Sequence, residues 1–211
     1  MNATELKAAF SCLSKIMTEN KDYLTKLDQQ NGDGDLGISM ANGFYAVNEY
    51  LASADESDLG VLLMRSSSVF NDKAPSSLGT VLSFGLMSMA RSLKGKADAS
   101  LIDIAEAMKS AVGFIMEKAG SKPGEKTVLD SLCPGVDKLV EMSGVDSKTA
   151  FKAAADISKE GAESTRQMRA VHGRAAYYGD KSIGVIDGGA VVGSLIFEAL
   201  YDFVSNKEAC E

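Results

Sequence analysis

The sequence predicts an all-α protein, a single domain of eight antiparallel up-and-down helices spanning residues 1–211. The composition favours helices, because alanine, leucine and methionine lose little freedom on entering one, and the chain has ten methionines but only three prolines. Apolar residues also recur at helical spacing, whereas the alternation typical of strands is scarce. A chain of 211 residues is long enough to bury one sizeable core.

Each helix is placed by its apolar stripe. The first begins at Asn2, which can form a capping box with Glu5, and it is expected to continue with a break to Gln30. Ser100 and Asp103 predict a capped start for a later helix. The remaining helices are predicted at 38–52, 58–71, 78–94, 100–118, 127–143, 147–171 and 190–206.

The connections between these helices are of two kinds that alternate along the chain. Short, ordinary links are predicted at 53–57, 95–99 and 144–146, and longer or chemically unusual ones at 29–37, 72–77, 119–126 and 172–189. Sequential helices joined by short links pack antiparallel, so the four unusual loops should meet at one end of the bundle. The alternative is that chance sorts the loops this way.

The first unusual loop holds three aspartates interleaved with glycines, Asp28, Asp33 and Asp35. Converging carboxylates repel one another, and a hard divalent cation would neutralise them. An EF-hand is excluded because Leu36 stands where its turn glycine should be, and Asn42 where its bidentate glutamate should be. We therefore predict Mg²⁺ with a phosphate ligand, the alternative being a solvated acidic turn.

Small or flexible residues stand at the starts of the helices that begin at this end, where free backbone N–H groups favour phosphate. Arg174 and Lys181 are the cations best placed to meet phosphate oxygens, although surface salt bridges would also explain them. The lone histidine, His172, is expected to be a surface or capping residue rather than a base. No P-loop or Rossmann fingerprint occurs.

Composition excludes some classes of function. The chain has 29 acidic and 22 basic side chains and a net charge of −7, without a basic cluster, so nucleic acid is not an expected partner. No apolar run is long enough for a membrane span, and no signal peptide is evident. The three cysteines, Cys12, Cys133 and Cys210, suggest neither a zinc site nor a disulfide framework. A reducing, cytoplasmic location is expected.

Three motifs together resemble the nucleotide-binding subunit of bacterial dihydroxyacetone kinases, of the type that works with the phosphotransferase system. The likeness covers nearly the whole chain. It rests on Leu27-Asp28 with Gly32-Asp33-Gly34-Asp35-Leu36-Gly37, on Pro123-Gly124-Glu125-Lys126-Thr127 with Asp130, and on Gly173-Arg174-Ala175-Ala176-Tyr177 with Ser182-Ile183-Gly184 and Asp187. The resemblance implies an eight-helix barrel.

The resemblance also implies roles for particular residues. Asp28, Asp33 and Asp35 would hold two Mg²⁺ ions on the diphosphate of a bound ADP or ATP, and Arg174 would take part in phosphoryl transfer. The nucleotide contacts predicted from the resemblance and the helix starts are Leu36, Gly37, Ile38, Ser39, Ser77, Leu78, Gly79, Thr127, Val128, Arg174, Asp187, Gly188 and Gly189.

The partners implied are a dihydroxyacetone-binding kinase subunit and a phosphohistidine donor protein, so the chain would be a kinase active only with partner subunits. A transcriptional regulator and a homodimer are further possibilities. Three departures from the family pattern stand at Leu36, where the family has histidine, at the glycine-poor stretch Pro75-Ser76-Ser77, and at Gly188, where it has proline. They keep open an alternative, a non-catalytic paralogue that binds Mg-nucleotide as a sensor or adaptor.

Overall fold

The computed structural model describes residues 1–205, and in that range the regular structure is helical. It contains nine α-helices and two 3-10 helices. Their bounds are α1 Ala3–Glu19, α2 Lys21–Asp28, α3 Leu36–Ser53, α4 Leu59–Lys73, α5 Ser77–Ser92, α6 Leu101–Ala119, α7 Leu129–Glu141, α8 Ser147–Ser164, η1 Thr165–Gln167, η2 Arg174–Ser182 and α9 Gly188–Ser205. The predicted all-α class is confirmed.

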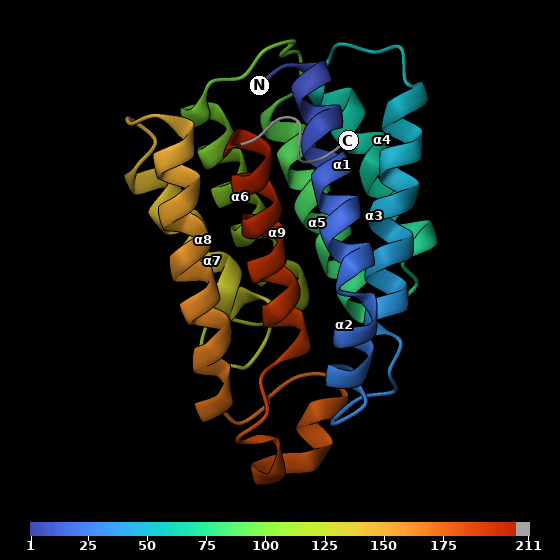
Figure 1. Ribbon diagram of the computed structural model, residues 1–211, viewed down its shortest axis with the longest axis vertical. Coiled ribbons are helices and arrows are strands. Elements are labelled where there is room, and N and C mark those ends of the chain that lie inside the picture. Colours follow the sequence, from blue (N-terminus) through green and yellow to red (C-terminus); the bar gives the residue numbers. More distant parts are fainter. Residues whose placement is uncertain (206–211) are drawn as a thin grey trace.

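The helices form a closed barrel (Figure 1). From α3 onward each α-helix packs against the next one in the chain, α1 packs against α3, and α9 closes the ring against α8 and α1. The first predicted helix is broken at Asn20 into α1 and α2, so eight positions around the barrel are filled by nine α-helices. The up-and-down arrangement predicted from the sequence is therefore confirmed. The predicted count of eight helices is approximate, because the first predicted helix forms two.

Both predicted capping boxes are present. Asn2 accepts a hydrogen bond from the Glu5 amide at the start of α1, and Ser100 accepts one from the Asp103 amide at the start of α6. In each box the acidic side chain bonds back to the amide of the capping residue, so two donors at the helix start are satisfied.

The helix predicted at 147–171 is too long, because α8 ends at Ser164 and the chain passes through η1 into an extended segment. The carbonyl oxygens of Thr165 and Met168 accept hydrogen bonds from the Lys126 ammonium. The Thr165 carbonyl also accepts from the Met168 amide, which is the bond of η1 and not of a continuing α-helix. The backbone therefore leaves the α-helix here, and these carbonyls face a side chain remote in the sequence, which periodicity alone cannot show.

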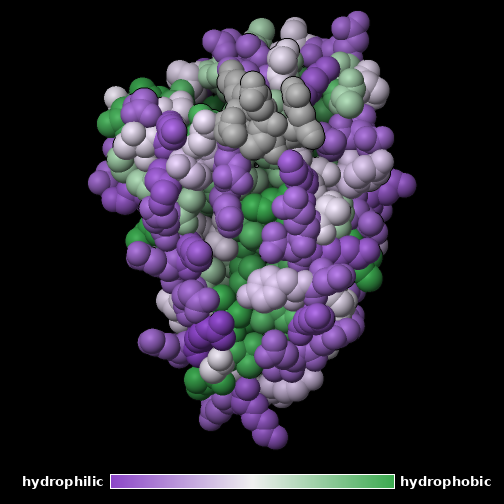
Figure 2. All heavy atoms as spheres, in the orientation of Figure 1, coloured by the Kyte–Doolittle hydropathy of each residue, from purple (hydrophilic) through white to green (hydrophobic). Residues whose placement is uncertain are grey.

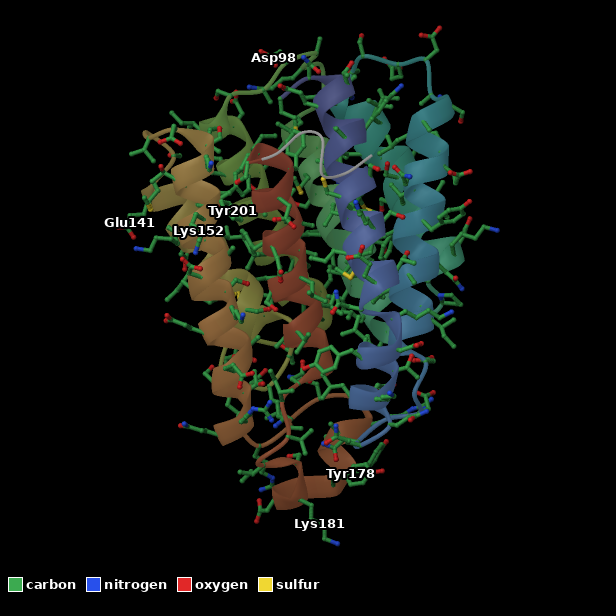
Figure 3. The ribbon with its side chains drawn as sticks, viewed as in Figure 1. Asp98, Glu141, Lys152, Tyr178, Lys181 and Tyr201 are labelled. Carbon is green, nitrogen blue, oxygen red and sulfur yellow. The ribbon has the colours of Figure 1, made fainter. Side chains whose placement is uncertain are left out.

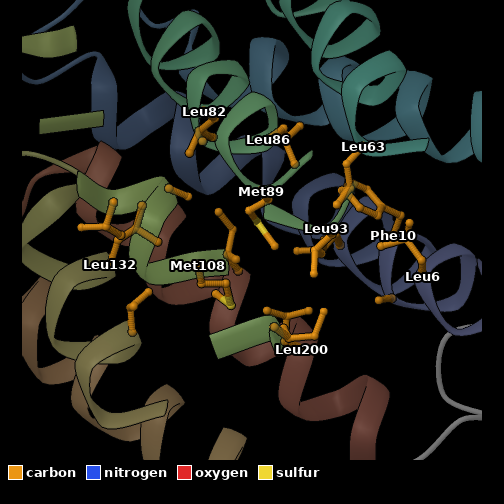
Figure 4. Close-up of a pocket in the computed structure, with 18 of the residues that line it drawn as sticks. Leu6, Phe10, Leu63, Leu82, Leu86, Met89, Leu93, Met108, Leu132 and Leu200 are labelled. Carbon is orange, nitrogen blue, oxygen red and sulfur yellow. The ribbon is translucent and has the colours of Figure 1, made fainter. Parts of the chain in front are cut away.

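The barrel interior is apolar and incompletely filled. Side chains from α1 and from α3 to α9 enclose a cavity of about 140 Å³, which Figure 4 shows in close-up with leucine, methionine and phenylalanine side chains around it. Phe44 and Phe70 meet edge to face, with ring centroids 4.9 Å apart. Apolar packing thus holds the helices as a frame for the loops at either end.

One described helix, α9, is long and apolar enough to cross a membrane by length and composition. Here it packs against α1, α7 and α8 and contributes Val192 and Phe197 to the core. On the face shown in Figure 2 hydrophilic residues predominate, and hydrophobic ones form a band down the middle.

The cysteines depart in part from expectation. Cys12 is disulfide-bonded, so the expectation of reduced thiols is wrong for this residue. Cys133 is free, and burial raises the pKa of its thiol to about 12, as suits a small packing residue. Cys210 lies outside the described residues.

The loops separate between the two ends of the barrel as predicted. Those around 53–57, 95–99 and 144–146 lie at the upper end in Figure 1, near the N-terminus. The segments before α3, α5, α7 and α9 lie at the lower end. Four sequence-distant segments therefore meet at one end of the fold.

Candidate functional site

The four segments at the lower end enclose a cleft of about 840 Å³. Its walls come from residues 27–36, 75–81, 119–128, 172–175 and 185–189. The convergence predicted from the alternation of loops is confirmed. The cleft takes in most of the predicted site residues, namely Asp28, Asp33, Asp35, Leu36, Ser77, Leu78, Thr127, Val128, Arg174, Asp187, Gly188 and Gly189.

Three carboxylates gather at one side of the cleft. Asp28 ends α2, Asp33 lies in the following loop, and Asp35 precedes α3, yet one oxygen of each lies within 4.8 Å of the others. The loop folds back because the Gly34 amide donates to Asp28 Oδ2 at 2.7 Å, and a Cβ at Gly32 would collide with the Asp28 carboxylate. The loop sequence thus builds the cluster locally.

The electrostatics of the cluster suit a cation. Burial, followed by the charges of Asp33 and Asp28, raises the pKa of Asp35. Arg174, which arrives from η2 on the far side of the cleft, forms an ion pair with Asp33 and counters this shift. Oxygen ligands of this kind are those that Mg²⁺ prefers, so the donor set fits the predicted metal.

The loop before α7 is held by Asp130. Its carboxylate accepts from the Gly124 amide at 2.5 Å and from the Thr127 amide at 2.7 Å. Between these two residues Lys126 adopts a left-handed conformation with φ 61°, which is uncommon for a residue with a side chain. The carboxylate therefore fixes a strained turn at the edge of the cleft.

The start of α5 is held by Ser76. Its hydroxyl accepts from the Gly79 amide at 3.1 Å and lies 2.7 Å from the Ser39 hydroxyl of α3. Pro75 has no amide hydrogen and so offers no donor to the cleft. The serine pair ties the starts of two cleft helices to each other.

Asp187 caps the start of α9, where its Oδ2 accepts from the Ala190 amide at 2.7 Å. Burial is the main reason that the pKa of this carboxyl is raised to about 6, while the nearby Lys126 charge opposes the shift. The group therefore titrates close to neutral pH in the folded chain.

We expect Asp187→Asn to gain stability over the wild type as the pH rises from about 4 to about 6. A carboxyl whose folded pKa lies above its unfolded value stabilises the fold below the unfolded pKa, and that contribution is lost as the pH rises through the folded one. Asparagine keeps an oxygen for the cap but carries no charge. Denaturant midpoints at pH 4, 5, 6 and 7 measure the difference, and a constant difference would contradict it.

Five predicted residues do not line the cleft. Gly37 packs against the Lys21 carbonyl, Gly79 packs against the Ala74 carbonyl, and Ser39 is buried beside Ser76. Ile38 is exposed on α3. Lys181 is exposed at the tip of η2 and points away from the barrel (Figure 3), so its predicted place beside the cleft is wrong.

Leu36 does line the cleft and packs toward α9. Its side chain lies so close to Gly188 that a Cβ there would sit 2.5 Å from Leu36 Cδ2. Two of the three departures from the pattern of the resembling family, Leu36 and Gly188, thus contact each other at the cleft. A larger residue at Gly188 would need Leu36 to move.

Two features of the site were not foreseen. His172 lines the cleft, and its Nε2 lies 2.7 Å from Glu125 Oε2, a contact that lowers the pKa of Glu125. Lys126 is buried, and its ammonium bonds only to backbone carbonyls among the described partners. The positive φ of Lys126 sets this residue apart in the structure. The sequence could not predict its contacts, because backbone carbonyls occur at every residue and no side-chain pattern marks the four that bind it.

The fold and the site define a class: all-helical barrels with an acidic, glycine-rich cleft at one end, suited to a divalent cation and an anionic ligand. The DAK2 domain matches residues 30–202, and the chain belongs to this family. The family assignment made from the sequence motifs is confirmed.

Relatives of similar length are ADP-binding subunits. The chain is 29% identical over 177 residues to the ADP-binding subunit DhaL of the PEP-dependent dihydroxyacetone kinase of Escherichia coli, covering 83% of this chain and 84% of that protein. It is 28% identical to the corresponding subunit of kinase 2 of Listeria innocua, covering 84% of each. A D-erythrulose kinase of Mycolicibacterium smegmatis is 29% identical, and the match covers 93% of this chain but 35% of that enzyme.

Solved structures support the fold. The dihydroxyacetone kinase of C. freundii in complex with AMP-PNP and Mg²⁺ superposes with a TM-score of 0.76 at 21% identity, over 96% of this chain and 34% of that one. The chain therefore corresponds to about a third of that enzyme.

Proposed function

We propose that this chain is the Mg-ADP-carrying subunit of a dihydroxyacetone kinase. In this role it passes a phosphoryl group from a phosphohistidine donor protein, through bound ADP and ATP, to dihydroxyacetone or a related ketose on a partner subunit. The observation that carries the proposal is the cluster of Asp28, Asp33 and Asp35 on a cleft of about 840 Å³ that is bordered by four helix starts. The names of the relatives from Escherichia coli and Listeria innocua support it.

Each part of the cleft has a task in this proposal. Asp28, Asp33 and Asp35 would hold two Mg²⁺ ions, which when bound would neutralise the charge of the phosphates. No side-chain cap closes the start of α3, so its first amides are free to donate to phosphate oxygens. Arg174 would exchange its contact with Asp33 for one with the transferred phosphoryl group.

The chemistry asks for positioning and charge neutralisation rather than for a base. Phosphoryl transfer passes through a loose transition state, in which little covalent work falls to the protein. His172, bonded to Glu125, is assigned the role of holding the loop rather than moving a proton. The chain would therefore need its partners to supply both the donor and the acceptor hydroxyl.

The partner subunits would dock on the lower end of the barrel, since the γ-phosphoryl group must face outward. Tyr177 is 91% exposed at the tip of η2 and offers an apolar contact there. A dihydroxyacetone-binding kinase subunit and a phosphohistidine protein are the proposed partners, with a transcriptional regulator and a homodimer as further candidates. A cytoplasmic location is part of the proposal. The erythrulose kinases among the relatives support a ketose as the acceptor.

The contact of Leu36 with Gly188 favours a second candidate, a Mg-nucleotide sensor or adaptor without turnover. A neutral side chain at Leu36 offers no hydrogen bond to a phosphate. In that case the cleft would bind the nucleotide, and the partner would respond to occupancy instead of receiving a phosphoryl group.

The test is a melting curve of the nucleotide-free chain with and without Mg-ADP, followed by a transfer assay with a dihydroxyacetone-binding subunit and a phosphohistidine donor. We expect a Mg²⁺-dependent rise in the melting temperature, because a ligand of the folded state stabilises by mass action. Binding with dihydroxyacetone phosphate formation supports the kinase, and binding without it supports the sensor. A folded chain with no shift at saturating Mg-ADP would contradict both.

A further inference from the structure

The segment between α8 and α9 leaves the barrel, crosses the cleft and returns. Its outgoing limb runs from Thr165 to Ala170, its returning limb from Ser182 to Asp187, and η2 forms most of the tip between them. Figure 3 shows Tyr178 and Lys181 on this tip, below the barrel. The segment brings Arg174 to the carboxylate cluster and Asp187 to the start of α9.

Lys126 joins both limbs. Its ammonium donates to the outgoing carbonyls of Thr165 at 2.8 Å and Met168 at 3.2 Å, and to the returning carbonyls of Ser182 at 2.7 Å and Val185 at 2.6 Å. Since an ammonium has three N–H donors, the four carbonyls share them and surround the group. These acceptors lie 39 to 59 residues along the chain from Lys126.

Placing this ammonium is costly for the protein. The residue is only 3% exposed, and burial lowers the pKa of its amine. Its backbone has φ 61°, a conformation that the Asp130 carboxylate holds from both sides. A buried charge in a strained turn persists when its contacts compensate, and here those contacts all go to the two limbs.

Other hydrogen bonds also join the limbs. The Gly184 amide donates to the Arg166 carbonyl at 2.7 Å, the Ala170 amide to the Ser182 hydroxyl at 3.0 Å, and the Asp187 amide to the Thr165 hydroxyl at 2.9 Å. The Arg166 guanidinium also donates to the Gly184 carbonyl at 3.4 Å. These bonds link the limbs to each other but not to the barrel. Glu125 contacts the two residues that follow the outgoing limb, Val171 and His172. Lys126 ties both limbs to the loop before α7, which is itself fixed by Asp130.

From this geometry we infer that Lys126 is a positioning residue that fixes Arg174 and Asp187 over the cleft by anchoring both limbs of segment 165–187. The expected effect of Lys126 on Mg-ADP binding rests on the proposed function. The anchoring of the two limbs does not, because it can be measured in the ligand-free chain. Without the ammonium the four carbonyls lose a shared donor, both limbs lose this tie to the loop before α7, and Arg174 no longer holds its place.

The first experiment compares Lys126→Met with Lys122→Met in the absence of nucleotide. Both variants lose an ammonium from the same loop, but Lys122 is exposed and serves as the matched control. We expect Lys126→Met to speed trypsin cleavage after Arg169, Arg174 and Lys181 and to speed amide exchange over 169–184, with helical circular dichroism unchanged. Lys122→Met should behave as the wild type. Equal cleavage and exchange in all three proteins would overturn the inference.

The second experiment separates positioning from a general loss of structure. We expect Lys126→Met to weaken Mg-ADP binding by about ten- to a hundredfold, the loss of one charge-assisted contact, in the wild-type background. In an Arg174→Ala background the same change should have a smaller effect, since one of the two residues that Lys126 positions is gone. The same factor in both backgrounds would overturn the inference.

If Lys126→Met does not fold, Lys126→Gln replaces it, because an amide keeps two N–H donors without the charge. We expect trypsin cleavage and amide exchange over 169–184 to be faster in Lys126→Gln than in the wild type, but slower than in an unfolded chain. Wild-type rates in Lys126→Gln together with wild-type Mg-ADP affinity would overturn the role of the ammonium. A wild-type chain that binds no Mg-ADP contradicts the proposed function, and the proteolysis and exchange results then decide the anchoring alone.

Discussion

Asp35→Asn is expected to raise the melting temperature of the ligand-free chain and to remove most of the further rise produced by Mg-ADP. The Asp35 carboxylate is destabilised in the folded chain by burial and by the charges of Asp33 and Asp28, so neutralising it relieves repulsion. The side chain makes no capping bond to α3, so the amide removes no structural contact there. Loss of a metal ligand should weaken Mg-ADP binding by about ten- to a hundredfold.

The opposite signs of the two effects make this test specific. A residue that served only the fold would lower the melting temperature of the ligand-free chain when changed. Asp180→Asn is the matched control, because Asp180 is exposed on η2 at the same end of the barrel but does not line the cleft. Thermal unfolding at pH 7, with and without Mg-ADP, measures both effects. A full Mg-ADP shift in Asp35→Asn would contradict the assignment of this residue as a metal ligand.

The position of the site could be predicted from the sequence because it depends on topology. Short links force neighbouring helices to run antiparallel, and the alternation of loop types then brings every second loop to one end. The aspartate loop could be predicted for a local reason, since the Gly34 amide and the small Gly32 let Asp28 meet Asp33 and Asp35 within eight residues.

Two predictions are wrong because a single backbone conformation, or a contact between distant residues, determines the structure there. The position of Lys181 in its loop predicts that it lies beside Arg174, but Gly179, with φ 54° and ψ −128°, breaks η2 and changes the direction of the chain. The predicted helix at 147–171 is longer than α8, which ends at Ser164 where η1 begins, and the carbonyls of Thr165 and Met168 face the Lys126 ammonium. Periodicity records which face is apolar, and it carries no information on which carbonyls a remote side chain will bind.

The ion pair between Arg174 and Asp33 connects segment 165–187 to the proposed metal site. The guanidinium supplies positive charge to the three carboxylates, and it lowers the pKa of Asp35 against the effect of its neighbours. A divalent cation bound at the proposed site would need the same Asp33 carboxylate, so Arg174 and the cation would compete for it. In the proposed complex Arg174 instead meets phosphate oxygens, where a guanidinium can bond in a bidentate manner.

Arg174→Ala is therefore expected to change two affinities in opposite directions. Mg²⁺ or Mn²⁺ alone should bind the variant more tightly, because the competing guanidinium is gone and the carboxylates keep their full charge. Mg-ADP should bind about ten- to a hundredfold more weakly, because a charge-assisted phosphate contact is lost. Titration calorimetry with each ligand measures both, and Lys181→Ala, from the same segment but outside the cleft, is the control that should change neither. Parallel losses of both affinities would mean that Arg174 supports the cluster instead of competing for it.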